Sequence, residues 1–402
     1  MTAEPDTTAN LEVLHFAYHL NRSIWNMESG QQSSSPTREI RVELGSVTYP
    51  IYIGTQWLGG ISRVLQRDAR DLSHAMVICD ASVASTFAEL VRHSIDALGV
   101  RTDMCIVPSG ETAKGVSQLT RLWDWMLTRG ADRRSIVVAV GGGVVGDLAG
   151  FAAATYQRGI RLVHIPTTLL AQVDSSVGGK TGINLPGGKN IIGAFWQPLM
   201  VAIDTNTLGS LPRREFASGI AEIIKYGVIE RPELFAWLEE HAAALLSRDA
   251  PAVTHAISIS CLTKAAIVGE DERETSGRRA ILNYGHTFAH AIETTAGFGR
   301  FLHGEAVAMG MQMAAACALG RGLVDREFVD RQRHLIEAFQ LPTRWPQAEP
   351  KQMLVAMQSD KKKEHGKLRL ILPTRLGHVD LVDDLTEDEI AAAILDPHQE
   401  GR

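Results

Sequence analysis

The sequence of 402 residues contains only four cysteines, and no two of them form a CxxC pair. Cys79, Cys105, Cys261 and Cys317 lie far apart in the chain, which argues against a thiolate zinc cluster and against a disulfide framework. Cysteines used in this way are typical of proteins from a reducing compartment. We therefore expect a cytoplasmic location.

Long hydrophobic runs and basic clusters are also missing. No continuous apolar run reaches the roughly 18 residues that a membrane span needs, so we expect no membrane association. Forty lysines and arginines against 46 aspartates and glutamates leave a net charge of −6, and no long basic run predicts a nucleic-acid partner. With 45% apolar and 21% charged residues, the composition is typical of a soluble globular protein. The length predicts roughly two to three domains.

The first 37 residues differ from the rest of the chain. A short apolar patch at 11–25 lacks the basic start and the cleavage site of a secretory signal. The Gln- and Ser-rich segment 31–36 is typical of a flexible linker. We predict a disordered extension over 1–37. The alternatives are an upstream start codon, with Met27 as the true start, or an arm that binds a partner.

From residue 38, short β-type runs alternate with segments of helical length. Alternating apolar residues over 38–53 predict a β-hairpin. Further β-type runs, with helix-length segments such as 116–129 between them, cover 75–79, 102–107, 135–140 and 161–165. This alternation predicts a Rossmann-like α/β domain over 38–210, with a mostly parallel sheet covered by helices.

After about residue 211 the β signal fades, and a helical second domain is predicted over 211–402. Stretches rich in Ala, Leu, Ile and Met cover 214–228, 232–247, 250–268, 287–295 and 304–319. Residues 368–382 are typical of a late hairpin. Thr386 and Glu389 form a capping box for a final helix that ends near Leu395.

A glycine cluster follows the apolar run at 135–140. Gly141, Gly143 and Gly146 satisfy the GxGxxG pattern, in which glycines let backbone N–H groups approach a pyrophosphate at a helix start. The pattern alone also fits a tight structural turn. No acidic residue ends the next strand, whereas Asp80 ends an earlier one, where its carboxylate could bind an adenosine ribose or cap a helix. The motif is therefore a dinucleotide site with a non-standard strand order, or it is no such site.

The segment after the glycine cluster is rich in groups suited to a polyanion. Arg158, Lys180 and Lys189 are cations in an apolar, Gly-rich region, where uncompensated charges are costly. This favours anion binding over a plain surface loop, and we predict a flexible turn at 178–181. The letters GGKT resemble the end of a P-loop, but Asp174 stands where its first glycine belongs, which argues against a nucleoside triphosphatase.

Histidines and carboxylates gather in the predicted helical domain. His286, His290 and Glu293 share one helix face at i, i+4 and i+7, and His303 begins the next helix. Glu222 lies in an apolar helix upstream. Imidazoles with a carboxylate suit a catalytic Zn²⁺ with an open coordination position. Spacing nominates His286 and His290 as ligands, by analogy with HExxH helices, but does not decide which two of the three histidines bind.

Nine motifs, in order, closely resemble the 3-dehydroquinate synthase family. They are PSGE (108–111), the block 141–158, QVDSSVGGKT (172–181), GAFWQP (193–198), AEIIK (221–225), DERE (271–274), LNYGHTF (282–288), LHGE (302–305) and DKK (360–362). The resemblance runs from about residue 40 to 395, which makes it far more specific than the glycine cluster alone.

The resemblance implies a dehydroquinate synthase-like fold and an enzyme of the shikimate pathway. Such an enzyme converts 3-deoxy-D-arabino-heptulosonate 7-phosphate into 3-dehydroquinate and phosphate. NAD⁺ is used catalytically: the C5 alcohol is oxidised, phosphate is eliminated, the ketone is reduced again, and the ring opens and closes by aldol addition. The resemblance also implies Zn²⁺ or Co²⁺ as a cofactor and a homodimer as the assembly.

Residue roles are carried over from the family position by position. The metal ligands become Glu222, His286 and His303, with His290 facing the substrate, and we adopt this set in place of the spacing argument. The residues that contact NAD become Asp80, Glu111, Lys114, Gly141, Gly142, Gly143, Val144, Asp147, Thr167, Thr168, Lys180 and Lys189. The residues around the substrate become Arg158, Asp174, Lys180, Lys189, Asn190, Lys225, Lys264, Glu274, Arg279, Asn283, His290 and Lys361.

These roles are chemically consistent. A divalent metal on the substrate hydroxyls lowers the cost of forming an alkoxide. Cations from both domains neutralise a phosphate and a carboxylate, so we expect binding to close the cleft and exclude water. His290 and Lys225 are the candidates for moving protons.

Three alternatives to this reading remain. Another sugar phosphate cyclase, of the inosose or valiolone synthase type, would take a substrate without a carboxylate; Arg279 and Asn283 suit an anion and favour the dehydroquinate reading. A metal-dependent alcohol or glycerol dehydrogenase would release NADH and need no array of phosphate-binding cations. A non-catalytic nucleotide-binding protein predicts broken metal ligands, whereas Glu222, His286 and His303 are all present.

Overall fold

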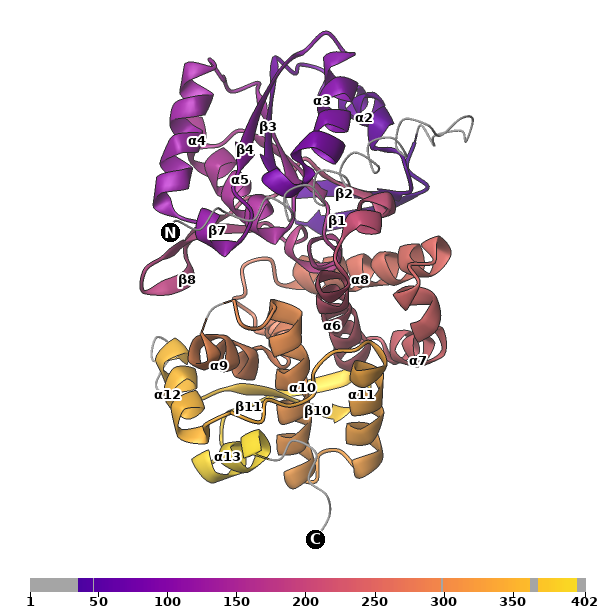
Figure 1. The fold of residues 1–402 in the computed structure, drawn as a ribbon, viewed down its shortest axis with the longest axis vertical. Coiled ribbons are helices and arrows are strands. Elements are labelled where there is room, and N and C mark those ends of the chain that lie inside the picture. The colour runs from indigo at the N-terminus through magenta and orange to yellow at the C-terminus, as the bar shows by residue number, and fades with distance from the viewer. Residues whose placement is uncertain (1–34, 46, 298, 362–367, 396–402) are drawn as a thin grey trace, which may run out of the picture.

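The structure is a computed structural model that describes residues 35–45, 47–297, 299–361 and 368–395. The predicted extension lies outside the described residues as far as residue 34, as do the side chains of 359–361. A sheet-bearing half and a mostly helical half follow one another along the chain (Figure 1).

A seven-stranded sheet forms the first half, in the order β1-β2-β9-β6-β5-β3-β4. β1 and β2 pair antiparallel, which confirms the predicted hairpin, and all other neighbours pair parallel. The strands are β1 (Arg38–Leu44), β2 (Val47–Gly54), β3 (His74–Asp80), β4 (Arg101–Val107), β5 (Ile136–Gly141), β6 (Arg161–Pro166) and β9 (Met200–Asp204).

Helices cover both faces of this sheet, because its central strands are apolar on both sides. Ala75, Val77 and Cys79 of β3 pack in one cluster with α2 (Ile61–Asp68) and α3 (Glu89–Asp96). The alternate residues Met76 and Ile78 pack in another cluster with helices α4 (Val116–Thr128) and α5 (Gly143–Thr155). The two-residue period of the strand thus assigns each side chain to one face.

The strand order reverses between β3 and β5. From β3 the chain continues through α3 to β4 on one side, whereas from β5 it continues through α5 to β6 on the other. In open α/β sheets, ligands bind at the carboxyl ends of the strands where the connections diverge in this way. Cys79 pairs with Val140, so Asp80 and Gly141 meet at that point. The order is non-standard, but it has a switch point at the glycine cluster.

The second half is built from helices with one small hairpin, as predicted. Its elements are α6 (Arg213–Ile229), α7 (Pro232–Leu246), α8 (Ala250–Glu270), α9 (His286–Ala296), α10 (His303–Gly320), α11 (Arg326–Ala338), α12 (Pro350–Lys361), β10 (Leu370–Arg375), β11 (His378–Val382) and α13 (Glu387–Leu395). The capping box is confirmed, since Thr386 N donates to Glu389 Oε2 (2.7 Å) and Glu389 N donates to Thr386 Oγ1 (3.2 Å).

Short 3₁₀ and π turns connect the longer elements. They are η1 (Leu58–Gly60), η2 (Ala81–Val83), η3 (Ala84–Ala88), η4 (Glu111–Ala113), η5 (Tyr156–Arg158), η6 (Ala171–Ser175), η7 (Thr205–Ser210) and η8 (Arg278–Asn283).

A third hydrophobic cluster forms a core that spans both halves. Val42 of β1 and Ile51 of β2 belong to the same buried cluster as Val253 and Ile257 of α8. By length and composition alone α8 could cross a membrane, but 67% of its apolar window is buried inside the protein. Residues from both sides of position 210 contribute to this core, so the predicted boundary between two domains stays a prediction.

A third hairpin, in the sheet-bearing half, was not predicted from the sequence. β7 (Lys180–Leu185) and β8 (Gly188–Phe195) pair antiparallel at the edge of the sheet-bearing half that faces α9 (Figure 1). The predicted flexible turn at 178–181 is therefore too long. Only Gly178 (φ 99°) and Gly179 (φ 70°) take the left-handed conformation, and Lys180 begins the strand.

Candidate active site

The glycine cluster forms a tight turn between β5 and α5. A Cβ atom on Gly142 would lie 3.0 Å from Thr168 Cγ2, and one on Gly143 would lie 2.9 Å from Ser175 Oγ. A side chain at either position would therefore have to displace its neighbour. α5 begins at Gly143, so its free backbone N–H groups and the positive end of its dipole lie at this turn, as phosphate binding requires. Val144 lies in the same first turn.

Asp80 lies directly beside this turn. A Cβ atom on Gly141 would be 3.2 Å from Asp80 Cβ, so the carboxyl ends of β3 and β5 are in contact. The carboxylate accepts hydrogen bonds from Ser82 N (2.8 Å) and Ser82 Oγ (2.6 Å) and thereby caps η2. The helix-capping reading of Asp80 is thus observed, and its use for a ribose stays a prediction.

A buried lysine joins the glycine turn to the β7–β8 hairpin. Lys114 is 4% exposed, and its ammonium contacts both the Asp147 carboxylate of α5 and the Asn190 side chain of β8. Nearby, Glu111 Oε1 accepts a hydrogen bond from Asn184 Nδ2 (2.9 Å). Burial raises the pKa of Asp147, and the Lys114 cation opposes that rise. The predicted NAD residues on these elements therefore form one connected group. Thr167 N donates a hydrogen bond to the backbone carbonyl that ends β5 (2.9 Å).

Glu222, His286 and His303 come together from three helices. One possible ligand atom of each lies within 4.8 Å of the others. Nε2 of His286 lies 3.5 Å from Glu222 Oε1, and Nε2 of His303 lies 3.7 Å from the same oxygen. His290 is outside this group, although its ring stands edge-on to that of His286 with centroids 6.0 Å apart. The arrangement matches the set taken from the family, not the pair that spacing nominated.

The surroundings of this triad fit a bound cation. Glu222 is fully buried, and neither of its carboxylate oxygens accepts a hydrogen bond from any described residue. The Lys225 ammonium lies in ion-pair contact with it, and the rings of His286 and His303 approach its Oε1. A buried carboxylate without donors is costly unless a cation satisfies it. Two imidazole nitrogens and one carboxylate are also the donor set of a catalytic zinc site.

The charge state of His286 suits a ligand. Burial, together with the nearby Lys225 cation, lowers the pKa of His286 well below its usual range, so the imidazole is neutral at pH 7. Its Nδ1 lies 3.1 Å from the Tyr284 backbone carbonyl, which fixes the proton on that nitrogen and leaves Nε2 free to bind metal.

Asp174 forms the centre of a second buried cluster. Its Oδ1 accepts hydrogen bonds from Lys264 Nζ (2.8 Å) and from Tyr226 Oη (2.9 Å). Burial alone would raise the pKa of Asp174, but the Lys264 and Lys225 cations outweigh burial and hold the pKa well below its usual range. The pKa of Lys264 is lowered by burial, which Asp174 partly opposes. The site therefore holds an ionised carboxylate between two buried amines.

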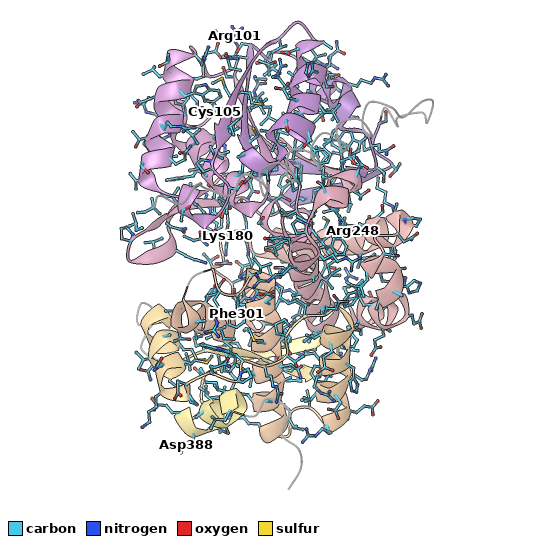
Figure 2. All side chains as sticks on the ribbon, viewed as in Figure 1. Arg101, Cys105, Lys180, Arg248, Phe301 and Asp388 are labelled. Carbon is cyan, nitrogen blue, oxygen red and sulfur yellow. The ribbon has the colours of Figure 1, made fainter. Side chains whose placement is uncertain are left out.

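Arg279, Glu274 and Lys180 form a third group between the two halves. Arg279 is 2% exposed, and its Nη1 donates to the Glu272 backbone carbonyl (2.7 Å). Glu274 Oε1 lies 3.4 Å from Arg279 Nε and also contacts Lys180 Nζ. Figure 2 shows Lys180 at the boundary between the sheet-bearing and helical halves. Lys189 extends from the same hairpin to Glu293 of α9, with 3.8 Å between Nζ and Oε1.

Some predicted residues stay apart from these clusters. Arg158 and Asn283 are exposed and form no described contact with the other predicted side chains. The side chain of Lys361 lies outside the described part of the chain. Conversely, Tyr226 bonds to Asp174 although it was not among the predicted residues. Its position four residues after Glu222, on the same face of an apolar helix, was the available signal.

Comparison with known proteins gives two consecutive family matches along the chain. Residues 104–218 match the family description "3-dehydroquinate synthase N-terminal", and residues 219–363 match "3-dehydroquinate synthase C-terminal". A 3-dehydroquinate synthase of Rhodopirellula baltica is 54% identical over 367 residues, which cover 90% of this chain and 98% of that protein.

Two solved structures share the whole fold. The 2-epi-5-epi-valiolone synthase of Streptomyces hygroscopicus subsp. jinggangensis 5008, with NAD⁺ and Zn²⁺ bound, has a TM-score of 0.81 at 29% identity, covering 89% of this chain and 99% of that one. A 2-deoxy-scyllo-inosose synthase complexed with carbaglucose-6-phosphate, NAD⁺ and Co²⁺ has a TM-score of 0.81 at 26% identity, with the same coverage. On the family matches and the relative at 54% identity, this chain belongs to the 3-dehydroquinate synthase family.

Proposed function

We propose that this protein converts 3-deoxy-D-arabino-heptulosonate 7-phosphate into 3-dehydroquinate and phosphate, with NAD⁺ and a divalent metal as cofactors. The relative at 54% identity bears the name of this activity, and it spans nearly the same length. The substrate is thus a sugar phosphate, and the shikimate pathway is the context that this activity implies.

The position of η6 is the structural observation that carries the proposal. η6 packs against α5, α6 and α8. At its end, Ser175 touches the glycine turn, while the neighbouring Asp174 bonds to Tyr226 and Lys264 of the helical half. Tyr226 follows Lys225, whose ammonium contacts Glu222 of the triad. A single five-residue turn therefore connects the nucleotide-binding elements with the metal-binding elements, as a reaction that uses both on one substrate requires.

Three residues would hold the metal: Glu222, His286 and His303. A Zn²⁺ or Co²⁺ ion at this site would act as a Lewis acid on the substrate hydroxyls and so favour loss of a proton. Lys225, buried at 1% exposure beside Glu222, is positioned to hold or accept a proton at its Nζ. The Asp174 carboxylate, kept ionised by its two lysines, can accept hydrogen bonds from sugar hydroxyls.

The turn at Gly141–Gly143, together with Asp80, Lys114 and Asp147, would hold NAD. Bound NAD⁺ would supply reversible hydride transfer at the C5 carbon, so that it is regenerated in each cycle. The reaction therefore needs no second substrate to restore the oxidation state of the cofactor.

The remaining cations suit the two anionic ends of the substrate. Lys180 and Arg279 meet at the boundary of the halves through Glu274, and Lys189 approaches from the β7–β8 hairpin. Arg279 can bind a carboxylate or phosphate in two-point fashion through its guanidinium. We propose that substrate binding replaces the internal partners of these cations and brings the halves together around it.

Turnover per NAD⁺ tests this function. Purified protein is incubated with Zn²⁺, the heptulosonate phosphate and sub-stoichiometric NAD⁺, and phosphate and dehydroquinate are measured. Many product molecules per NAD⁺ are expected. Accumulation of NADH in proportion to substrate would identify a dehydrogenase instead. Equal turnover of a hexose or heptose phosphate that lacks the carboxylate would identify another sugar phosphate cyclase.

We further propose that the enzyme is a cytoplasmic homodimer. All four cysteines are free and buried, which suits a reducing compartment. The homodimer rests on the family resemblance, and light scattering of the purified protein tests it.

A further inference from the structure

Glu293 lies beside the metal triad without belonging to it. It sits on α9, seven residues after His286, and its side chain is 11% exposed. Its Oε1 lies 3.5 Å from His303 Nδ1. This is the ring nitrogen opposite Nε2, the nitrogen that approaches Glu222 at 3.7 Å. The carboxylate therefore contacts His303 on the side away from the triad.

The two histidines of the triad are supported differently. Both direct Nε2 toward Glu222 Oε1, and both have an acceptor at Nδ1. For His286 that acceptor is the neutral carbonyl of Tyr284 at 3.1 Å, whereas for His303 it is the negative carboxylate of Glu293. An acceptor at the second nitrogen fixes the tautomer and ring orientation of a metal-binding histidine, and a carboxylate also makes the ligand more basic.

Lys189 contacts the same carboxylate oxygen from the other half of the protein. Its Nζ lies 3.8 Å from Glu293 Oε1, and β8, which carries it, belongs to the hairpin next to the glycine turn. A cation at this distance partly neutralises the carboxylate and repels a divalent ion nearby. Glu293 is thus shared between His303 and a lysine that we place at the substrate.

We propose that Glu293 is a positioning residue for the metal, which orients His303 and sets the affinity of the site, and that Lys189 weakens this effect. The inference rests on the metal site of the proposed function. Glu293 itself would not touch the metal or the substrate. The two substitutions are therefore expected to change metal affinity in opposite directions. Loss of the carboxylate weakens metal binding, whereas loss of the lysine strengthens it.

Zinc affinity of the substrate-free protein tests the inference. Metal-free wild-type, Glu293→Gln and Lys189→Met proteins are titrated with Zn²⁺ in competition with a chromophoric chelator at one pH. Glu293→Gln is expected to bind Zn²⁺ about 10 to 100 times more weakly, the range found for loss of such a supporting partner. Lys189→Met is expected to bind Zn²⁺ more tightly than the wild type. The visible spectrum of bound Co²⁺ should change in Glu293→Gln, because His303 is no longer held in one orientation.

Glu270→Gln is the matched control. It removes one negative charge from a carboxylate that pairs with Arg278 at 2.6 Å, and it should leave zinc affinity unchanged. Equal affinity of Glu293→Gln and wild type, or an equal loss in Glu270→Gln, would overturn the inference. Weaker binding by Lys189→Met would also overturn it, since loosened packing would then explain both variants. A wild type that binds no Zn²⁺ would overturn the proposed metal site as well, which separates the two failures.

Discussion

The hydroxyl of Tyr226 lies 2.9 Å from Asp174 Oδ1 and links α6 to η6. Tyr226 is fully buried, and the Asp174 carboxylate that it contacts is ionised. The bond thus fixes the charged group of a turn that packs against both α5 and α6.

Tyr226→Phe removes this hydrogen bond without changing the packing of the ring. A hydrogen bond to a charged group contributes about 1.5 to 3 kcal/mol, so we expect a loss of about 2 kcal/mol in the free energy of unfolding. We also expect kcat to fall by roughly tenfold, because a loosened Asp174 misplaces the substrate hydroxyls. Urea unfolding and steady-state kinetics measure the two effects.

Tyr156→Phe is the control for that variant. Tyr156 is also buried, and its hydroxyl donates to the Ala131 carbonyl (3.2 Å) on the sheet-bearing half. The Tyr156→Phe variant should lose about 1 kcal/mol in the free energy of unfolding and keep its activity. If both variants retain full kcat, the Tyr226 hydroxyl has no role in positioning Asp174.

His303→Ala should abolish turnover by removing one of three metal ligands. NAD⁺ binding should stay largely intact, because His303 has no described contact with the glycine turn. Metal content by mass spectrometry and NAD⁺ affinity by titration give the two readouts, with the exposed His334→Ala as the control. Near-normal activity with full metal content would show that the ligand assignment is wrong.

Lys114→Met tests the link between the glycine turn and the β7–β8 hairpin. The substitution leaves the Asp147 carboxylate without its cation in a largely buried position. Breaking a fully buried pair costs about 3 to 5 kcal/mol, and we expect about 2 kcal/mol here because Asp147 is partly exposed. The double variant Lys114→Met/Asp147→Asn should recover part of that stability. A double variant less stable than the single one would argue that the cation does not compensate Asp147.

A buried histidine predicts a pH dependence of stability. Burial lowers the pKa of His164, on β6, to about 4. The unfolded chain takes up this proton near pH 6.5, so stability falls as the pH drops from 6.5 to 4 and this histidine causes no further loss below that. Between pH 7 and 5 the contribution is about 2 kcal/mol. The free energy of unfolding of the wild type should fall by that much more than that of His164→Gln; parallel curves would contradict the assignment.

The main elements could be predicted because their signals are local. The β5 strand is an apolar run that ends in glycine, and the Thr386–Glu389 capping box is encoded within four residues. The β7–β8 hairpin was missed although Pro186 and Gly187 mark a turn between two β-type runs. Its two short strands form a separate sheet and do not belong to the alternation of strands and helices that predicts the large sheet.

The arrangement of the site depends on contacts that a sequence pattern does not encode. Lys189 and Glu293 are more than a hundred positions apart, and their contact requires that the hairpin face α9. In the same way, His290 has the spacing of a ligand, yet the turn before α10 brings His303 to Glu222 instead. The spacing of residues on one helix identifies a shared face, but the neighbouring helix decides which of them meet a metal.

The fate of the hydrogen at C5 shows whether NAD⁺ takes a hydride from the substrate and returns it to the same molecule. Substrate labelled with deuterium at C5 is converted by the enzyme with Zn²⁺ and a trace of unlabelled NAD⁺, and the product and the free nicotinamide pool are analysed by mass spectrometry. If the nicotinamide takes this hydride and returns it to the same molecule, dehydroquinate keeps the deuterium at that carbon through many turnovers. Deuterium in free NADH, or dehydroquinate that has lost the label, would show that the hydride is not returned to the molecule from which it came.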